Sequence, residues 1–291
     1  MNHFEKTDLS PFTIRNYNNC LNKWIEFLKK PLDKIVISPK TSFASLKKIE
    51  LIKHTPHVYH SYLSAMIAYI KYNLADHPKK DKMMKMWYDL MYNNDTPIRE
   101  HYKDNKPTEK QAPQALTWDQ IEKVRDGLPD GIPKLLLSMY SLLTPERADY
   151  FELEICRGQT PTSGNWIDLS KKKLVMTEFK TARKYERLEQ DIPEELMRQI
   201  HLSLTEKPRE YLFVNRFKGP FDRATFSNYA NRIISDLFDK RTTLTCIRHA
   251  FVTKLDFNKP IRQLDGISSS MGHNMATQKT YAWINEVVHP K

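Results

Sequence analysis

The chain has 291 residues, of which 40% are hydrophobic, and a formal net charge of +11. This length fits one large domain or two ordinary ones, and the apolar content is too high for a disordered chain. The 7 glycines form neither GxGxxG nor GxxxxGK[ST], which argues against ATP or NAD chemistry through the common glycine-rich loops.

The basic surplus is concentrated in the N-terminal part. The first 110 residues contain 19 Lys and Arg against 12 Asp and Glu, and the remaining 181 contain 27 against 23. Such a surplus favours a polyanionic partner, because neutralised phosphates release counterions. The alternative is a basic but otherwise ordinary protein. Three cysteines without paired spacing indicate free thiols in a reducing compartment, and no apolar run is as long as a membrane span.

The first hundred residues predict a helical domain. Apolar side chains at helical spacing predict helices at 10–30, 42–52, 57–75 and 79–92, without a strand signal between them. Ser10 is a good N-cap for the first helix, and Pro31 ends it. We therefore predict a small helical domain over residues 1–105.

A second domain is predicted over residues 115–291, after a polar linker at 106–114 that contains Pro107 and Pro113. Thr117 and Gln120 have the capping-box spacing at the start of its first helix. Alternating patterns predict three short strands, at 166–169, 174–177 and 187–192. Further helices are predicted at 132–143, 194–205, 223–238, 246–255 and 274–284. The predicted fold class is mainly α with a small antiparallel sheet.

Polar residues of this second domain have an order that suits phosphate chemistry: Arg147, Lys180, Arg248, His273 and Tyr281. Two arginines can clamp one phosphate through planar bidentate forks. A tyrosine beside that phosphate can attack it and hold it covalently. Taken singly, each residue also has a plainer interpretation as a surface ion pair, a solvated turn residue or a core aromatic.

The sequence around these residues resembles the tyrosine recombinase (phage-type integrase) family. The resemblance lies in Pro145-Glu146-Arg147-Ala148-Asp149-Tyr150, in Arg248-His249, in Met271-Gly272-His273, and in Tyr281 eight residues later. It covers residues 115–285 through these motifs and the region before them more weakly. The helical domain is similar to the core-binding domain of that family, and the second domain to its α+β catalytic domain.

The resemblance implies a role for each residue. Arg147 and Arg248 would clamp the scissile phosphate, His273 would donate to a phosphate oxygen, and Tyr281 would be the nucleophile. Lys180 would be the general acid for the leaving 5′ oxygen, with Lys184 as the alternative lysine.

Two further residues have supporting interpretations. Asp149 would support an arginine fork. His249 is interpreted as a packed, hydrogen-bonded helix residue rather than a catalyst.

Thr245 departs from the pattern of the family, which usually has His-x-x-Arg-His around the second arginine. A threonine can hydrogen-bond a phosphate oxygen but cannot act as a general base near neutral pH. This departure supports one alternative to a recombinase, a catalytically weakened DNA-binding member of the family. A type IB topoisomerase-like DNA relaxase, which would use similar residues, is a second alternative.

The resemblance also implies partners. Both domains would bind double-stranded DNA, and four protomers would assemble on paired DNA sites. No cofactor or metal is expected, because two arginines can supply the charge stabilisation of the transition state. We expect an intracellular protein that does not bind a membrane and that is located in the compartment that holds its target DNA.

Overall fold

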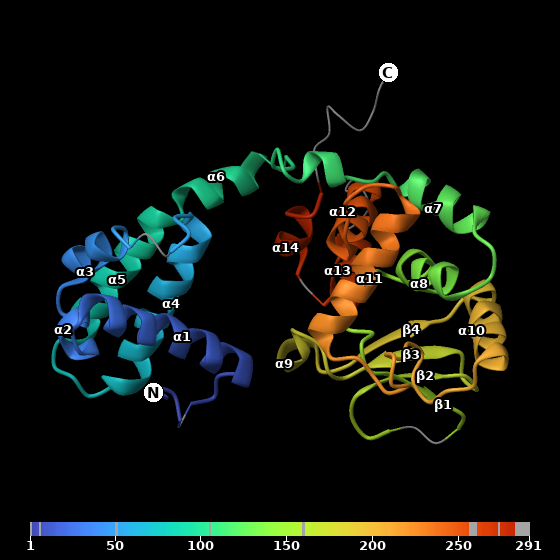
Figure 1. Ribbon diagram of the computed structural model, residues 1–291, viewed down its shortest axis with the longest axis horizontal. Helices are drawn as coiled ribbons and strands as arrows, with labels where there is room; N and C mark the ends of the chain where they lie inside the picture. Colours follow the sequence, from blue (N-terminus) through green and yellow to red (C-terminus); the bar gives the residue numbers. More distant parts are fainter. Residues whose placement is uncertain are drawn as a thin grey trace. The chain divides into compact units, whose positions relative to one another are not determined.

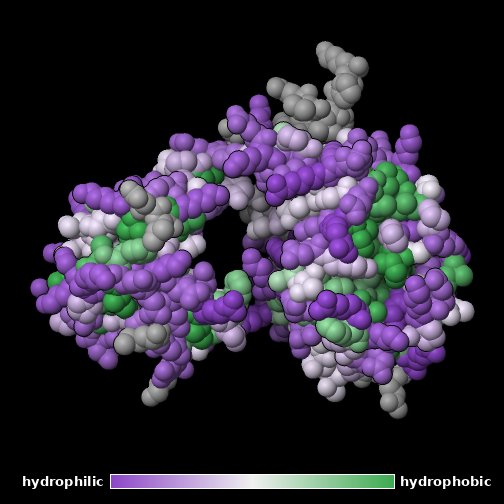
Figure 2. Space-filling model, viewed as in Figure 1, coloured by the Kyte–Doolittle hydropathy of each residue, from purple (hydrophilic) through white to green (hydrophobic). Residues whose placement is uncertain are grey.

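The chain forms two compact units, Met1–Asp104 and Asn105–Lys291 (Figure 1). The computed structural model describes residues 2–5, 7–49, 52–104, 106–158, 161–255, 261–272 and 274–282. The predicted site residue His273 therefore lies outside the described residues. In the view of Figure 2, hydrophilic residues cover most of the visible surface of each unit.

The described part of the first unit is helical. Its elements are α1 (Pro11–Leu28), α2 (Leu32–Val36), α3 (Pro39–Leu46), α4 (Pro56–Asn73), α5 (Lys80–Asn94) and α6 (Thr96–Asp104). Trp24 of α1 lies at the centre of the core, where its ring contacts Trp87 of α5 edge to face at 5.3 Å and Tyr62 of α4 at 5.9 Å. The indole nitrogen of Trp87 donates to the Val36 carbonyl at 2.9 Å, which ties α2 to this core.

Most helices of the first unit follow the predicted pattern, with Ser10 accepting from the Thr13 amide at the start of α1. The helix predicted at 42–52 instead spans Pro39–Leu46, because Pro39 suits the first turn of a helix. Helices α2 and α6 were not predicted. Both are short, so each shows too few turns for an apolar period to stand out.

The second unit combines helices with one small sheet. Its elements are η1 (Ala112–Gln114), α7 (Trp118–Gly127), α8 (Ile132–Ser141), β1 (Leu153–Cys156), β2 (Asn165–Asp168), β3 (Lys173–Met176), α9 (Ala182–Tyr185), β4 (Leu188–Asp191), α10 (Glu194–Glu206), α11 (Arg223–Leu237), α12 (Leu244–Lys254), α13 (Ile261–Ser270) and α14 (Met275–Lys279). Side chains of the sheet and of the surrounding helices share one apolar core, which includes Leu136, Ile167, Ile200 and Ile247. The capping box of α7 is confirmed, since Thr117 and Gln120 bond reciprocally.

The sheet has the strand order β1-β2-β3-β4. The prediction of a mainly α fold with a small sheet is confirmed, and the β2–β3 and β3–β4 pairs are antiparallel as expected. The sheet is mixed, however, because the unpredicted strand β1 pairs with β2 in parallel. The other edge of β1 is extended by Tyr211, which bridges Glu154.

Two further elements of the second unit differ from the prediction. The connection between β3 and β4 contains the short helix α9, which was not predicted. Helix α13 occupies a segment for which no helix was predicted, because its run of serines resembles a loop. No helix in the described part of the chain has the length and apolarity that a membrane crossing requires.

Candidate active site

The loop that carries Arg147 connects α8 to β1. The phenol of Tyr140, in the last turn of α8, donates to the Arg147 carbonyl at 2.8 Å. The Gln190 side chain of β4 accepts from the Thr144 amide at 2.8 Å, and Ser270 at the end of α13 donates to the Thr144 hydroxyl at 3.2 Å. Three elements therefore hold this loop, two of them through its backbone, while the Arg147 side chain stays partly exposed.

Arg248 projects from α12 against the same loop, and its side chain is only 1% exposed. Its Nη1 atom donates to the Pro145 carbonyl at 2.6 Å and lies 4.0 Å from the Glu146 carboxylate. Its Nε and Nη2 atoms have no hydrogen-bond partner among the described residues. Buried guanidinium nitrogens are costly to leave unpaired, so these donors are poised for an anion.

Tyr281 follows α14 and brings its phenol to both arginines. The positive charges of Arg248 and Arg147 act on this phenol, and the Arg248 guanidinium carbon lies 5.1 Å from the centre of the ring. Burial opposes ionisation of the phenol. The charges of Arg248 and Arg147 outweigh this effect, so the pKa of Tyr281 lies below its ordinary value. The arrangement thus makes ionisation of the tyrosine, and so its use as a nucleophile, easier than for an ordinary phenol.

His249 holds the backbone of Tyr281. Its Nδ1 atom lies 2.9 Å from the Tyr281 carbonyl, and the two rings are 4.9 Å apart. A carbonyl only accepts, so Nδ1 carries the donated proton. Burial lowers the pKa of His249 to about 4, aided by the charge of Arg248 and opposed by the bond to Tyr281. The imidazole is therefore neutral near pH 7, which suits a positioning contact.

Lys180 is exposed on the connection between β3 and α9. Its neighbour Thr181 donates to the Gly272 carbonyl at 2.6 Å, which attaches this connection to the turn before His273. The competing residue Lys184 has its ammonium group 5.1 Å from the centre of the Tyr185 ring. Of the two lysines, Lys180 is thus the one directly beside the contact with the 271–272 turn.

Gly272 is required by the geometry of that turn. Its φ is +67°, a left-handed conformation that glycine adopts at little cost. A Cβ at this position would lie 2.9 Å from the Thr181 hydroxyl and 3.5 Å from the Phe179 ring. The glycine of the Met-Gly-His motif therefore permits the close approach between the turn and the Lys180 segment.

Asp149 and Thr245 are the two remaining predicted residues. The Asp149 carboxylate is 1% exposed and pairs with Arg223 of α11 rather than with Arg147. Its support for an arginine fork stays a prediction. Thr245 is exposed in the first turn of α12 and does not enter the core.

Glu146 also belongs to the site, although no role was predicted for it. It is 1% exposed, and its Oε1 atom has no hydrogen-bond partner among the described residues. Burial raises the pKa of its carboxyl to about 8, although the charges of Arg248 and Arg147 oppose the shift. Its place directly before Arg147 was the only signal in the sequence.

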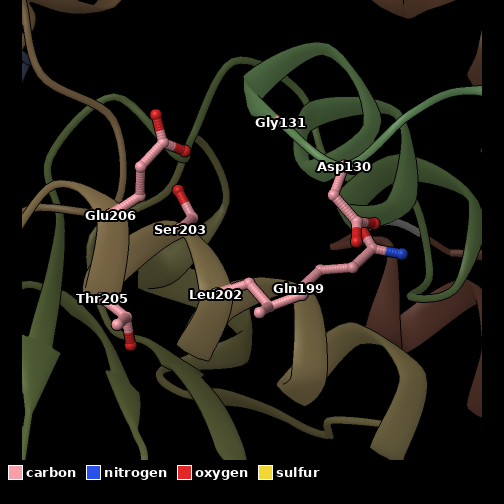
Figure 3. Close-up of a pocket in the computed structure, with 7 residues that line it drawn as sticks. All are labelled: Asp130, Gly131, Gln199, Leu202, Ser203, Thr205 and Glu206. Atoms are coloured by element: carbon pink, nitrogen blue, oxygen red, sulfur yellow. The ribbon is translucent and has the colours of Figure 1, made fainter.

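The second unit also contains a cavity of about 350 Å³ between α10 and the α7–α8 connection (Figure 3). Its lining includes the carboxylates of Asp130 and Glu206, and no candidate catalytic residue. Acidic groups repel a phosphate, so this cavity does not compete with the arginine site. Among the described residues, no group of three or more His, Cys, Asp or Glu side chains could hold a metal ion.

Solved structures of similar fold include an integrase and two recombinases. A lambda integrase (75–356) dimer bound to a COC′ core site shares 13% identity, with 98% of this chain and 93% of that chain covered and a TM-score of 0.49. XerA recombinase shares 19% identity over 96% and 89% of the two chains, with a TM-score of 0.45. XerH site-specific recombinase bound to its difH substrate shares 13% over 98% and 90%, with a TM-score of 0.43.

These neighbours are tyrosine recombinases. They are thus of the same family that the motifs of the chain resemble. No family model matches the chain, and no curated protein matches it. At such low identities and TM-scores, we infer the function from the side chains of the site and not from this likeness.

Proposed function

We propose that the chain is a site-specific recombinase that cuts and rejoins duplex DNA, with Tyr281 as its nucleophile. The observation that supports it most is the convergence of Arg147 and Arg248 on the Tyr281 phenol. A plain core tyrosine has its pKa raised by burial, whereas two arginines reverse that effect here. A buried guanidinium with unpaired donors beside a phenol suits an oxyanion such as a phosphodiester.

The proposed cleavage step is a transesterification. The Tyr281 phenolate oxygen forms a bond to the scissile phosphorus, and the bond from phosphorus to the 5′ oxygen breaks. Lys180 gives its proton to that leaving oxygen, and the phenol proton goes to solvent. Arg147 and Arg248 stabilise the charge of the pentavalent state, which exceeds that of the diester. The products are a 3′-phosphotyrosine and a free 5′-hydroxyl.

Rejoining reverses the step with a 5′-hydroxyl from a partner strand. One phosphoester replaces another at each stage, so the reaction needs no nucleotide cofactor. His273 is proposed as a further donor to the phosphate. Full exchange would use four protomers on paired DNA sites, in the compartment that holds the target DNA.

A covalent-adduct assay tests this function. The protein is incubated with a duplex nicked near the cut site, so that the short 5′-hydroxyl fragment diffuses away and the intermediate accumulates. We expect a protein–DNA adduct, with the DNA attached at Tyr281 by peptide mass spectrometry. No adduct would favour the alternative of a catalytically inactive DNA-binding protein. Adduct formation and supercoil relaxation without exchange between two duplexes would favour the relaxase alternative.

Binding to duplex DNA should weaken steeply with salt, because phosphates would supply most contacts. On a log–log plot, the affinity should fall with a slope of roughly −0.9 for each phosphate neutralised. A fragment of residues 1–110 should bind duplex weakly, since its Lys and Arg exceed its Asp and Glu by 19 to 12. Fluorescence anisotropy over a salt series would measure both. A fragment without salt-sensitive binding would remove the N-terminal unit from the proposed DNA interface.

Thr245 offers a test of the motif alignment. Because Thr245 is exposed, Thr245→His should fold normally, and we expect an equal or higher rate of adduct formation. Thr245→Val should lower the rate by about fivefold, the value of one hydrogen bond of about 1 kcal/mol. Single-turnover assays on nicked duplex would measure both rates. Unchanged rates in Thr245→Val would mean that the hydroxyl does not contact the phosphate.

A further inference from the structure

The side chain of Arg248 contacts both Glu146 and the residue before it. The Oε2 atom of Glu146 lies 4.0 Å from Nη1 of Arg248, and that same Nη1 donates to the carbonyl of Pro145, the preceding residue, at 2.6 Å. Glu146 and Arg248 are each 1% exposed. The guanidinium of Arg248 therefore rests on the backbone and the carboxyl of one loop, the loop that also carries Arg147.

The charged and titratable groups around Glu146 come from three elements. Arg147, Asp149 and Tyr150 belong to its own loop, Tyr140 comes from α8, and Arg248 comes from α12. Asp149 is itself paired with Arg223. Burial raises the pKa of Glu146 to about 8 against the opposing charge of Arg248. Most copies of the carboxyl are therefore protonated and neutral at pH 7.

The charge state of Glu146 decides how much positive charge the site offers. A neutral carboxyl 4.0 Å from Nη1 of Arg248 leaves both guanidinium charges for a phosphate and for the Tyr281 phenolate. An ionised carboxylate next to Arg248 would cancel one of those charges in a buried environment, where charges interact strongly. Ionisation of Glu146 would thus oppose both the clamp and the lowered pKa of Tyr281.

We propose that Glu146 is a positioning residue that orients Arg248 as a neutral acid, and that its ionisation diverts Arg248 from the scissile phosphate and slows strand cleavage. The proposal rests on the proposed function. On this proposal, the decline of the cleavage rate at high pH is caused by ionisation of Glu146 and not by ionisation of the reacting groups.

The test compares adduct formation on nicked duplex between pH 6 and pH 10. Glu146→Gln keeps the shape and the acceptor oxygen but cannot ionise. Near pH 7 we expect its rate within about twofold of the wild type. At pH 9, one unit above the pKa of Glu146, about a tenth of the wild-type carboxyls keep their proton. The wild type should therefore be about tenfold slower than Glu146→Gln there.

Asp168→Asn provides the matched control. Asp168 is a second buried carboxylate of the same unit, 1% exposed, and it accepts from the Ser170 and Lys171 amides at the end of β2. Its loss removes a buried carboxylate away from the arginines. We expect the pH profile of Asp168→Asn to follow the wild type. If Glu146→Gln does not fold, Glu146→Leu should still lack the alkaline decline, at a lower rate throughout.

A second readout does not depend on activity. A carboxyl whose pKa is raised in the folded protein binds its proton more tightly than in the unfolded chain. Its stabilising contribution is full below about pH 4.5, the ordinary value, and is lost as the pH rises through about 8. Thermal unfolding should show the wild type losing stability between pH 5 and pH 9 relative to Glu146→Gln, while Asp168→Asn follows the wild type.

The outcomes separate this proposal from the function on which it rests. Absence of an adduct in the wild type at every pH would contradict both. A wild-type adduct with the same pH profile in Glu146→Gln would overturn only the role of Glu146. The same would follow if the two proteins had identical pH dependence of unfolding, since Glu146 would then hold no extra proton.

Discussion

Tyr281→Phe is expected to abolish covalent attachment to nicked duplex, with the DNA affinity nearly unchanged. The hydroxyl oxygen is the proposed nucleophile, while the ring that lies 4.9 Å from His249 is kept. Because the backbone contact between His249 and Tyr281 does not involve the phenol, the fold around the site should be retained. Gel assays of the adduct and anisotropy of DNA binding measure the two properties separately.

Tyr229 is the appropriate control for this substitution. It lies on α11 stacked on Phe221 at 4.9 Å, and burial raises its pKa despite the nearby charges of Arg232 and Arg209. The pKa of Tyr281 moves in the opposite direction because its arginines outweigh burial. Tyr229→Phe should therefore keep full adduct formation. An adduct retained in Tyr281→Phe would assign the nucleophile to another tyrosine, and Tyr229 and Tyr185 would be the first to examine.

Local signals in the sequence predicted those elements whose stability is local. The cap at Ser10 and the apolar spacing of α1 are contained within one segment, as is the capping box of α7. Strand β1 was missed because no hairpin turn joins it to its partner strand. It pairs in parallel with β2 and bridges Tyr211, more than fifty residues away. Such pairing leaves no period that a short window can show.

The same distinction holds for the site. The motif order predicted Arg147, Arg248 and Tyr281 as neighbours, and the structure brings their side chains together. Their catalytic roles and that of Lys180 stay predictions. Glu146 and Arg223 were not predicted, because their importance comes from burial against partners far along the chain. A carboxylate before an arginine resembles an ordinary surface pair until α12 covers it.

Arg147→Ala and Arg248→Ala should each slow adduct formation by about a hundredfold or more, the usual cost of removing one donor to a developing charge. The two variants should differ in stability. Arg147 is partly exposed, so its loss should disturb the fold little. Removing Arg248 leaves the Pro145 carbonyl without its buried donor, a cost of about 1–3 kcal/mol. Thermal unfolding beside the single-turnover rate separates these effects.

Lysine at either position should restore little of the lost rate. An ammonium group can replace the charge and one donor, but it cannot grip a phosphate through a planar bidentate fork. At position 248 it would also have to replace the donor to the Pro145 carbonyl. Arg198→Ala is the control, because Arg198 pairs with Asp130 and Glu195 on the surface of the same unit and should leave the rate unchanged. Arg248→Lys and Arg147→Lys would then both remain at least tenfold slower than the wild type. Full activity in either lysine variant would show that charge alone suffices there, and the bidentate clamp on the phosphate would have to be abandoned at that position.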